Sequence, residues 1–284
     1  MRAPGGCPAD LVPGDHRRVV QRFLPRPELQ AVVECGIVVQ RAAGSLSRFP
    51  AMPRAMLTWT QPIGGAAGVG FHALSTRATV HEHPVSLRAV GLVLPPGTAS
   101  RLLGMSTGAL VDVSLPWAAI AGPSEAARLD DELHLAAGDA GRLLALQSSV
   151  RRVLAQGPER VQRARAEQLD RLCLAVGRDG PRAAAELALG ERQLERRCRA
   201  WLGLAPKQLQ RLARLHGLLS DALRRQRPPD ADAALAAGFY DQSHLAREAR
   251  LLTGAPLREL LREAHPDGAW WPLATQRLPA RRLG

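Results

Sequence analysis

Two clusters of polar side chains at helical spacing are the residues in this sequence best suited to bind a polyanion. Arginine, glutamine and serine all donate hydrogen bonds, and arginine carries a permanent charge that phosphate attracts. The upstream cluster holds Arg192, Arg196 and Arg199, and the downstream cluster holds Gln242, Ser243, Arg247 and Arg250. The chemistry that these residues predict is recognition of double-stranded DNA, through its phosphates and its base edges.

Each cluster lies opposite an apolar stripe, which indicates that a helix positions it. Leu245, Ala249 and Leu252 follow one another in steps of four and three, so they share one helical face. The upstream stripe consists of Leu194, Cys198 and Trp201. The two segments align at a constant offset, with Leu194 on Leu245, Arg196 on Arg247 and Gly203 on Gly254. The sequence therefore predicts two helix-turn-helix units in one chain.

Further helices are expected around these two segments. A long helix from Pro206 to about Arg225 is predicted to join the units, with leucines along one face. The first recognition-type helix is expected over residues 191–202, and Asp230 is expected to cap the short helix that opens the second unit.

The charge of the chain is concentrated in this part of the sequence. The formal net charge is +12. Residues 161–284 contribute +8 of it, from 22 basic and 14 acidic side chains. A domain that binds phosphates needs such a surplus. Because 37 of the 38 basic residues are arginine, a general preference for arginine is an alternative cause.

The first half of the chain has β character. Short segments rich in β-formers recur about every ten residues, punctuated by glycine and proline: 36–40, 55–60, 69–74, 79–83 and 89–94. The predicted fold class is α+β, with a small β-barrel or sandwich-like domain followed by an all-α domain. The expected parts are a loose tail (1–20), a β-rich sensor or dimerisation domain (21–122), a helical connector (123–160) broken at Gly138, the double helix-turn-helix domain (161–265) and a C-terminal tail (266–284). Gly157 and Pro158 are the expected hinge.

The C-terminal hundred residues resemble the DNA-binding domain of the AraC/XylS transcriptional regulators. The resemblance rests on residues 184–194 with Arg196, on GLAPKQLQRLARL from Gly203, on GFYDQSHLAR from Gly238 and on TGAP from Thr253. It covers roughly residues 161–264, and the GFxDQSHxxR pattern is highly specific. It implies that the exposed face of each recognition helix reads bases.

Carried over residue by residue, the resemblance implies roles for individual side chains. The implied base contacts are Arg192, Glu195, Arg196, Gln242, Ser243 and Arg247. Arg199 and Arg250 are expected on phosphates, and His244 could help to position one. Two departures from the family pattern stand out. Gly190 replaces the usual Ser or Thr cap, and Cys198 and Ala249 replace phenylalanine. We expect DNA binding to survive these changes with lower stability.

Residues 89–122 resemble, less specifically, part of the N-terminal sensor domain in one branch of these regulators. The resemblance implies a β-rich domain that binds a small-molecule effector or a second copy of the chain, so a homodimer is one expected arrangement. It implies no cofactor and names no ligand.

Enzyme chemistry has little support in this sequence. His81 and His83 would share one side of a strand, and with His72 they could form a metal site in a barrel. Structural or surface histidines are the preferred interpretation, because no further ligand pattern follows them. No phosphate loop, Gly-x-Ser-x-Gly motif or CxxC pair occurs. Two alternatives to a non-enzymatic regulator remain: a metal-dependent β-barrel enzyme fused to a DNA-binding module, and a basic helical module that binds an acidic protein.

The expected location is the cytoplasm. The first 20 residues contain no apolar run typical of a secretion signal. No stretch approaches the roughly 20 apolar residues that cross a bilayer, so no membrane partner is expected.

Overall fold

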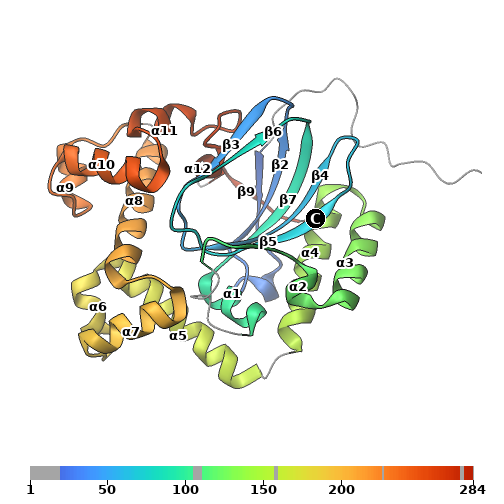
Figure 1. Ribbon diagram of the computed structural model, residues 1–284, viewed down its shortest axis with the longest axis horizontal. Coiled ribbons are helices and arrows are strands. Elements are labelled where there is room, and N and C mark those ends of the chain that lie inside the picture. The colour runs from blue at the N-terminus through green and yellow to red at the C-terminus, as the bar shows by residue number, and fades with distance from the viewer. Residues whose placement is uncertain (1–19, 105–110, 157–158, 226, 276–277, 284) are drawn as a thin grey trace, which may run out of the picture.

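The computed structural model describes residues 20–104, 111–156, 159–225, 227–275 and 278–283. The side chains of residues 159–162 and 181 are left out as well. Figure 1 shows a strongly curved sheet with helices on two sides, and a separate group of helices that extends away from it. The α+β fold class predicted from the sequence is confirmed. The expected hinge at residues 157–158 lies outside the described residues.

The β-rich part is built from one large sheet and one separate pair of antiparallel strands. The large sheet has the order β8-β5-β4-β7-β2-β1-β9, and β3 pairs with β6 separately. The strands are β1 (Val20–Phe23), β2 (Cys35–Arg41), β3 (Ser45–Phe49), β4 (Ala55–Pro62), β5 (Gly68–His72), β6 (Thr79–His83), β7 (Leu87–Leu94), β8 (Ser114–Pro116) and β9 (Ala280–Arg281). All described pairings are antiparallel except the parallel pair β1–β9.

Helices cover the convex side of the sheet. They are η1 (Pro27–Leu29), α1 (Pro96–Leu103), α2 (Ala118–Ala121), α3 (Pro123–Leu135) and α4 (Gly138–Ala155). The break predicted at Gly138 is present, with the glycine at φ 68°. Gly36 on β2 allows α4 to approach closely, because a Cβ there would lie 2.8 Å from a methyl carbon of Leu143. The indole of Trp117 is fully buried and donates to Ser149 Oγ on α4 at 3.0 Å.

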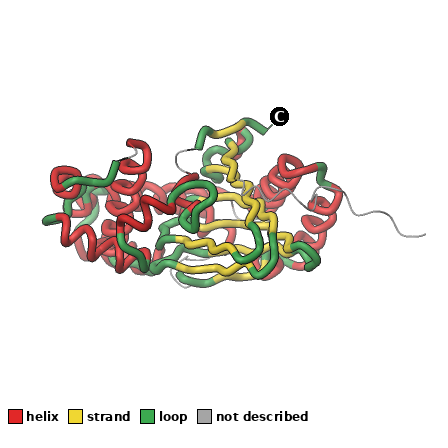
Figure 2. Tube along the Cα trace, turned by 90° about the horizontal axis from the view of Figure 1, so that it is seen from above, coloured by secondary structure: helices red, strands yellow, loops and turns green. Residues whose placement is uncertain are grey.

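The remaining helices form the second half of the molecule. They are α5 (Glu159–Arg178), α6 (Gly180–Glu186), α7 (Glu191–Leu202), α8 (Pro206–Arg225), α9 (Ala231–Ala236), α10 (Gln242–Thr253), α11 (Leu257–Glu263) and α12 (Trp271–Ala274). Figure 2 shows the strands between this helical half and the α3–α4 pair. The helices of the described residues include none with the length and apolar character needed to cross a bilayer.

One continuous hydrophobic core joins the two halves. It includes Leu57 and Phe71 from the sheet, Leu172 from α5 and Leu219 from α8. Trp59 and Trp117 belong to it. On the side of the first helix-turn-helix unit, α1 packs on α5, and Gly97 N donates to the Asp170 carboxylate at 2.7 Å.

The chain after α11 returns to the sheet, where the sequence suggested only a tail. Trp270 and Trp271 are buried, and β9 forms the edge of the large sheet by pairing with β1, with Arg22 opposite Ala280. This return places C-terminal residues directly against the β-rich part (Figure 1).

Candidate nucleic-acid interface

Two helix-turn-helix units lie at opposite ends of α8. In Figure 1, α6 and α7 form one unit, α9 and α10 form the other, and α8 runs between them. The observed bounds of α7 and α8 agree with the predicted ranges. An α-helix of 20 residues spans about 30 Å, since each residue adds about 1.5 Å.

Both recognition helices bury one face and expose the other. Leu194 and Cys198 of α7 are buried, as are Leu245 and Ala249 of α10. The apolar stripe predicted for α7 differs at one position: Leu202 is fully buried, and Trp201 is only half-buried. Burial raises the pKa of the Cys198 thiol to about 12, so it acts as a small apolar side chain.

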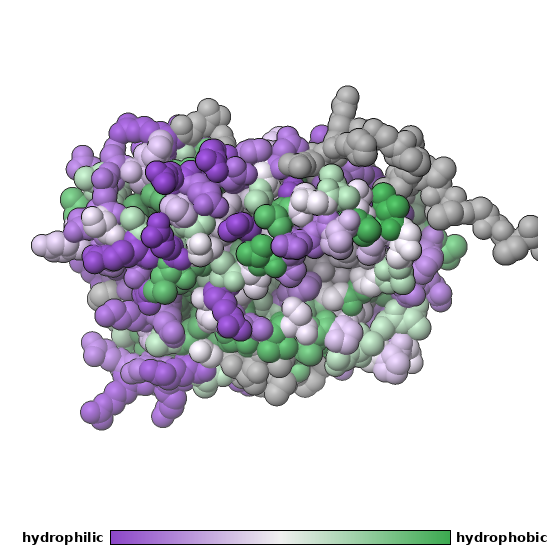
Figure 3. All heavy atoms as spheres, turned by 45° about the horizontal axis from the view of Figure 1, so that its top comes forward, coloured by the Kyte–Doolittle hydropathy of each residue, from purple (hydrophilic) through white to green (hydrophobic). Residues whose placement is uncertain are grey.

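Eight of the nine predicted contact residues are exposed. On α7 these are Arg192, Glu195, Arg196 and Arg199, and on α10 they are Gln242, Ser243, Arg247 and Arg250. Figure 3 shows hydrophilic side chains concentrated over the helical half of the molecule. Both polar faces are therefore open to solvent.

Three of the predicted residues interact with neighbouring side chains or backbone in the structure. Arg199 forms an ion pair with Glu195, with Nη2 at 3.0 Å from Oε1. His244 is half-buried, and its Nδ1 accepts from Tyr240 N at 3.2 Å. Its ring also packs edge-on against Phe239. His244 therefore supports the turn before α10 as well as facing the surface.

The two helices begin differently. Asp241 caps α10, because its carboxylate accepts from His244 N at 2.6 Å. No side chain caps α7, whose N-cap is Gly190, as expected from the departure at that position. The Asp241 cap was missed in the sequence, although aspartate directly before a helix is a common N-cap signal.

Specific contacts fix α10 on the connecting helix α8. Arg211 donates two hydrogen bonds to the Glu248 carboxylate, from Nε to Oε2 at 2.6 Å and from Nη2 to Oε1 at 3.0 Å. Arg214 donates to Gly238 O at 3.1 Å, and a Cβ at position 238 would lie 2.9 Å from this guanidinium. Gly238 also has φ 82°, which favours glycine. Sequence reasoning missed Arg211 and Glu248, because their pairing joins two helices 37 residues apart.

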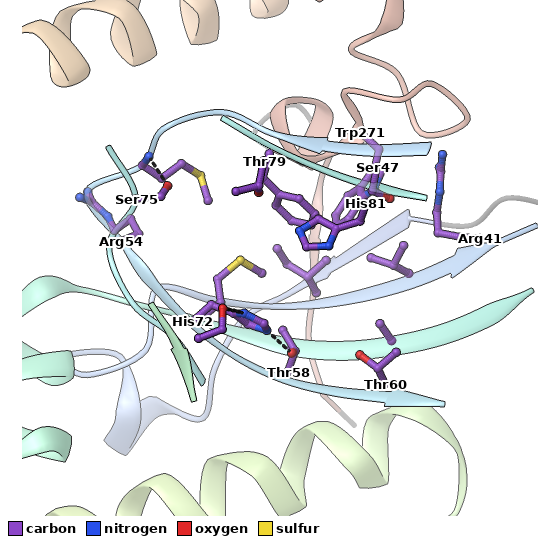
Figure 4. Close-up of a pocket in the computed structure, with 18 of the residues that line it drawn as sticks. Arg41, Ser47, Arg54, Thr58, Thr60, His72, Ser75, Thr79, His81 and Trp271 are labelled. Atoms are coloured by element: carbon purple, nitrogen blue, oxygen red, sulfur yellow. Dashed lines mark hydrogen bonds between the residues drawn. The ribbon is translucent and has the colours of Figure 1, made fainter. Parts of the chain in front are cut away.

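A second candidate site is a cavity of about 430 Å³ in the β-rich part. It lies between the concave side of the large sheet and the β3–β6 pair (Figure 4). Ile37, Val39, Met52, Met56 and Phe49 give it largely apolar walls. Such a cavity has the size and lining of a small-molecule site.

The three histidines that suggested a metal site all line this cavity, but they have other partners. His72 bonds Thr58 Oγ1 at 2.9 Å and Ser114 Oγ at 2.8 Å, and His83 bonds Ser47 Oγ at 2.8 Å. The His81 ring packs edge-on against Phe49. Burial lowers the pKa of His72 and His83, with nearby charges adding to it. Within the described part of the chain, no three metal-ligating side chains form a group that could hold an ion.

Comparison with known proteins identifies the helical half. Residues 183–263 match a family model described as a helix-turn-helix domain. No curated protein matches the sequence at a significant level.

Among solved structures, ToxT of Vibrio cholerae is similar in overall arrangement. ToxT from strain O395 is 9% identical, with a TM-score of 0.43 over 80% of this chain and 96% of that chain. The same protein bound to (E)-4-(8-methylnaphthalen-1-yl)but-3-enoic acid is 12% identical, with a TM-score of 0.45 over 79% and 97%. ToxT from strain SCE256 with a bound unsaturated fatty acid is 10% identical, with a TM-score of 0.44 over 80% and 94%. These values are too low for a ligand or a residue role to be carried over.

The matched domain and the two exposed helical faces define a helix-turn-helix DNA-binding protein. The helix-turn-helix domain, residues 183–263, is of the AraC type.

Proposed function

We propose that this protein is a transcription regulator of the AraC type, and that it binds a specific DNA sequence by inserting α7 and α10 into adjacent major-groove segments on one face of a duplex. The observation that carries the proposal is the repeat itself: two recognition helices with exposed polar faces, joined by a helix of 20 residues. Successive major-groove segments on one face lie about 34 Å apart, which is close to the roughly 30 Å length of α8. One chain can then read an asymmetric site.

The exposed residues divide into two kinds of contact in this proposal. Arg192, Arg196 and Arg247 suit guanine, Gln242 suits adenine, Ser243 suits several bases, and Glu195 can accept from cytosine once it separates from Arg199. Arg199 and Arg250, further along their helices, suit phosphates, and His244 supports the turn beside one. Sequence choice then comes from the first group, and most of the salt dependence comes from the arginines.

The cavity in the β-rich part supports a further step, in which a small molecule with an apolar body regulates DNA binding. In the alternative, association with a second copy of the chain regulates DNA binding instead of a small molecule. The α3–α4 pair, where Leu135 is 87% exposed, is the surface that suits such a homodimer. Either way, the protein acts where chromosomal DNA is accessible, in the cytoplasm of a bacterial-type cell.

The test is binding of the purified protein to the DNA upstream of its own coding sequence, with a scrambled duplex of the same composition as control. We expect selective binding that weakens steeply with salt, because each neutralised phosphate contributes about −0.9 to the slope of log K against log salt concentration. Equal, weak binding to both duplexes would count against sequence recognition at this DNA. Sedimentation with and without the duplex distinguishes a single-chain complex from a dimeric one.

A further inference from the structure

One wall of the cavity comes from the far end of the chain. Trp271 lines the cavity, and it belongs to the C-terminal segment (residues 264–275) that directly follows α11. Its indole N–H donates to Ser47 Oγ at 2.8 Å, and that hydroxyl bonds His83 Nε2 at 2.8 Å. Its ring packs edge-on against Phe49 at 5.4 Å between centroids. Figure 4 shows Trp271 beside Ser47, on the side of the cavity opposite His72.

Strands of the β-rich part hold the C-terminal segment at its backbone. The Arg41 guanidinium is buried and donates to Pro266 O and Gly268 O, both at 3.3 Å. Arg48 N on β3 donates to Ala269 O at 2.8 Å. The Arg48 side chain lies 3.9 Å from the Glu259 carboxylate on α11. The segment is therefore fixed between the cavity and the last helix of the second helix-turn-helix region.

The two adjacent tryptophans point into different hydrophobic clusters. Trp270 is fully buried in the main core, and its backbone N–H donates to Glu263 O at the end of α11. Trp271 belongs to a smaller cluster with Cys35, Ile37 and Val39 of β2. Because the two residues are consecutive, a shift of the Trp271 backbone also moves Trp270 and its hydrogen bond to the end of α11.

A second connection joins the cavity rim to α10. Ala51 N donates to Leu252 O, near the end of α10, at 3.2 Å. Ala51 O accepts from His216 Nε2 on α8 at 2.5 Å. The next residue, Met52, lines the cavity. The first helix-turn-helix unit has a different connection to the β-rich part, through α1 on α5 at Gly97 and Asp170, neither of which lines the cavity.

We propose that the C-terminal segment is part of the ligand site, and that Trp271 transmits occupancy of the cavity to the second helix-turn-helix unit. This inference rests on the proposed function, in which the cavity binds a small molecule with an apolar body. A ligand that displaces the indole breaks its bond to Ser47 and shifts α11 and α10. DNA affinity then changes through the second recognition helix, while the first helix keeps its position.

The test uses the full-length protein, the fluorescent apolar anion 8-anilinonaphthalene-1-sulfonate as the probe ligand, and the upstream duplex carrying a far-red label. The quantity compared is the ratio of DNA Kd values with and without saturating probe, measured within each variant. The variants are Trp271→Ala, the conservative Trp271→Phe, and Met56→Trp, which fills the cavity from β4. The matched control is Ile63→Ala, a half-exposed apolar residue outside the cavity.

We expect saturating probe to change the DNA Kd of the wild type and of Ile63→Ala by at least about fivefold, the lower end of typical allosteric coupling. By linkage, DNA should change the probe Kd by the same factor. The change should fall below about twofold in Trp271→Ala, and Met56→Trp should abolish probe binding. These ratios, rather than absolute affinities, carry the comparison.

Several results would overturn the inference: no saturable probe binding to the wild type, probe binding that persists in Met56→Trp, or an undiminished change in Trp271→Ala. If Trp271→Ala loses its cooperative unfolding transition, Trp271→Phe decides. This variant keeps an aromatic ring but loses the N–H that donates to Ser47. A smaller probe-induced change in its DNA Kd than in the wild type supports the inference, and an equal change overturns it. If the wild type does not prefer the upstream duplex to the scrambled one, the result counts against the proposed function. If it does prefer the upstream duplex, but the probe changes the DNA Kd of the wild type and of Trp271→Ala by the same factor, the result counts against this inference alone.

Discussion

The two helix-turn-helix units follow one plan but are stabilised by different interactions. Both recognition helices have 12 residues and end at a left-handed glycine, Gly203 at φ 68° and Gly254 at φ 73°. The second helix is capped by Asp241 and carries the half-buried ion pair between Glu248 and Arg211. At the position equivalent to Glu248, the first helix has Arg197, whose guanidinium lies 5.3 Å from the centre of the Trp201 ring.

The two units therefore resemble each other in their exposed faces but differ in the contacts that support their recognition helices. Arg196 and Arg247 occupy equivalent, exposed positions, although the buried sides of their helices use different chemistry. The second unit also contacts the cavity rim at Ala51 and the C-terminal segment through α11, whereas α5 connects the first unit to α1. We therefore expect equivalent roles in DNA reading and unequal roles in stability and regulation.

The largest expected effect tests the equivalence of the two faces. Arg196→Ala and Arg247→Ala should each weaken binding to the cognate duplex by about 1–3 kcal/mol and relax specificity, because each removes a charged donor to a base edge. Fluorescence anisotropy with cognate and scrambled duplexes measures both effects. Arg151→Ala, an exposed arginine on α4, is the control and should bind like the wild type. Unchanged binding in both test variants would refute the assignment of these faces.

The second prediction concerns the ion pair that only the second helix has at this position. Glu248→Gln should lower the free energy of unfolding by about 1.5 kcal/mol, since Arg211 loses a charge-assisted pair of hydrogen bonds. The Glu248 side chain is 15% exposed and the Arg211 side chain 33%, so solvent screens the pair only in part. Arg197→Gln, at the equivalent position of α7, should cost about 0.5 kcal/mol, because its contact with Trp201 is half-exposed. Denaturant unfolding of both variants tests the contrast, and equal losses would contradict it.

A smaller effect is expected from the cap on α10. Asp241→Ala should destabilise this helix by about 1 kcal/mol, because His244 N loses its acceptor. Hydrogen exchange of individual amides should show faster exchange in the first turn of α10 and no change in α7. Faster exchange spread equally over both helices would mean that the cap does not act locally.

The smallest expected effect is a gain in the stability of α7, the recognition helix of the first unit. Gly190 has an extended backbone at φ −73° and ψ 152°, and a Cβ there meets nothing within 4 Å. Gly190→Ser should therefore supply the missing cap and stabilise α7 by about 0.5 kcal/mol, partly by restricting the unfolded chain. A higher midpoint of thermal unfolding, with slower exchange confined to α7, is the expected result. A lower midpoint would contradict this reading of the N-cap.

Local patterns in the sequence were sufficient to predict the helical half. The bounds of α7 and α8 follow from apolar residues at helical spacing, with Gly203 capping the end of α7 and Pro206 opening α8. Strand β3 was missed because its inward side chains include Ser45 and Ser47 rather than apolar residues. The β1–β9 pair was missed because it joins residues about 260 positions apart.

The two candidate sites also differ in how far the sequence predicts them, because one lies within single helices and the other joins distant segments. Each recognition face lies on one helix, so its spacing is visible in the sequence. Eight of the nine residues predicted for the two faces are exposed. The cavity depends on side chains from several strands and on Trp271, which no local pattern brings together. The base contacts themselves stay a prediction until DNA is bound.

The most direct measurement is a footprint of the protein on its upstream DNA, repeated with Arg196→Ala and Arg247→Ala. Two helices in adjacent major-groove segments should protect two zones about 10–10.5 base pairs apart on one face of the duplex. Each variant should lose protection at a different zone, because each alters one helix. A single protected zone, or loss of the same zone in both variants, would contradict the claim that both helices read one duplex.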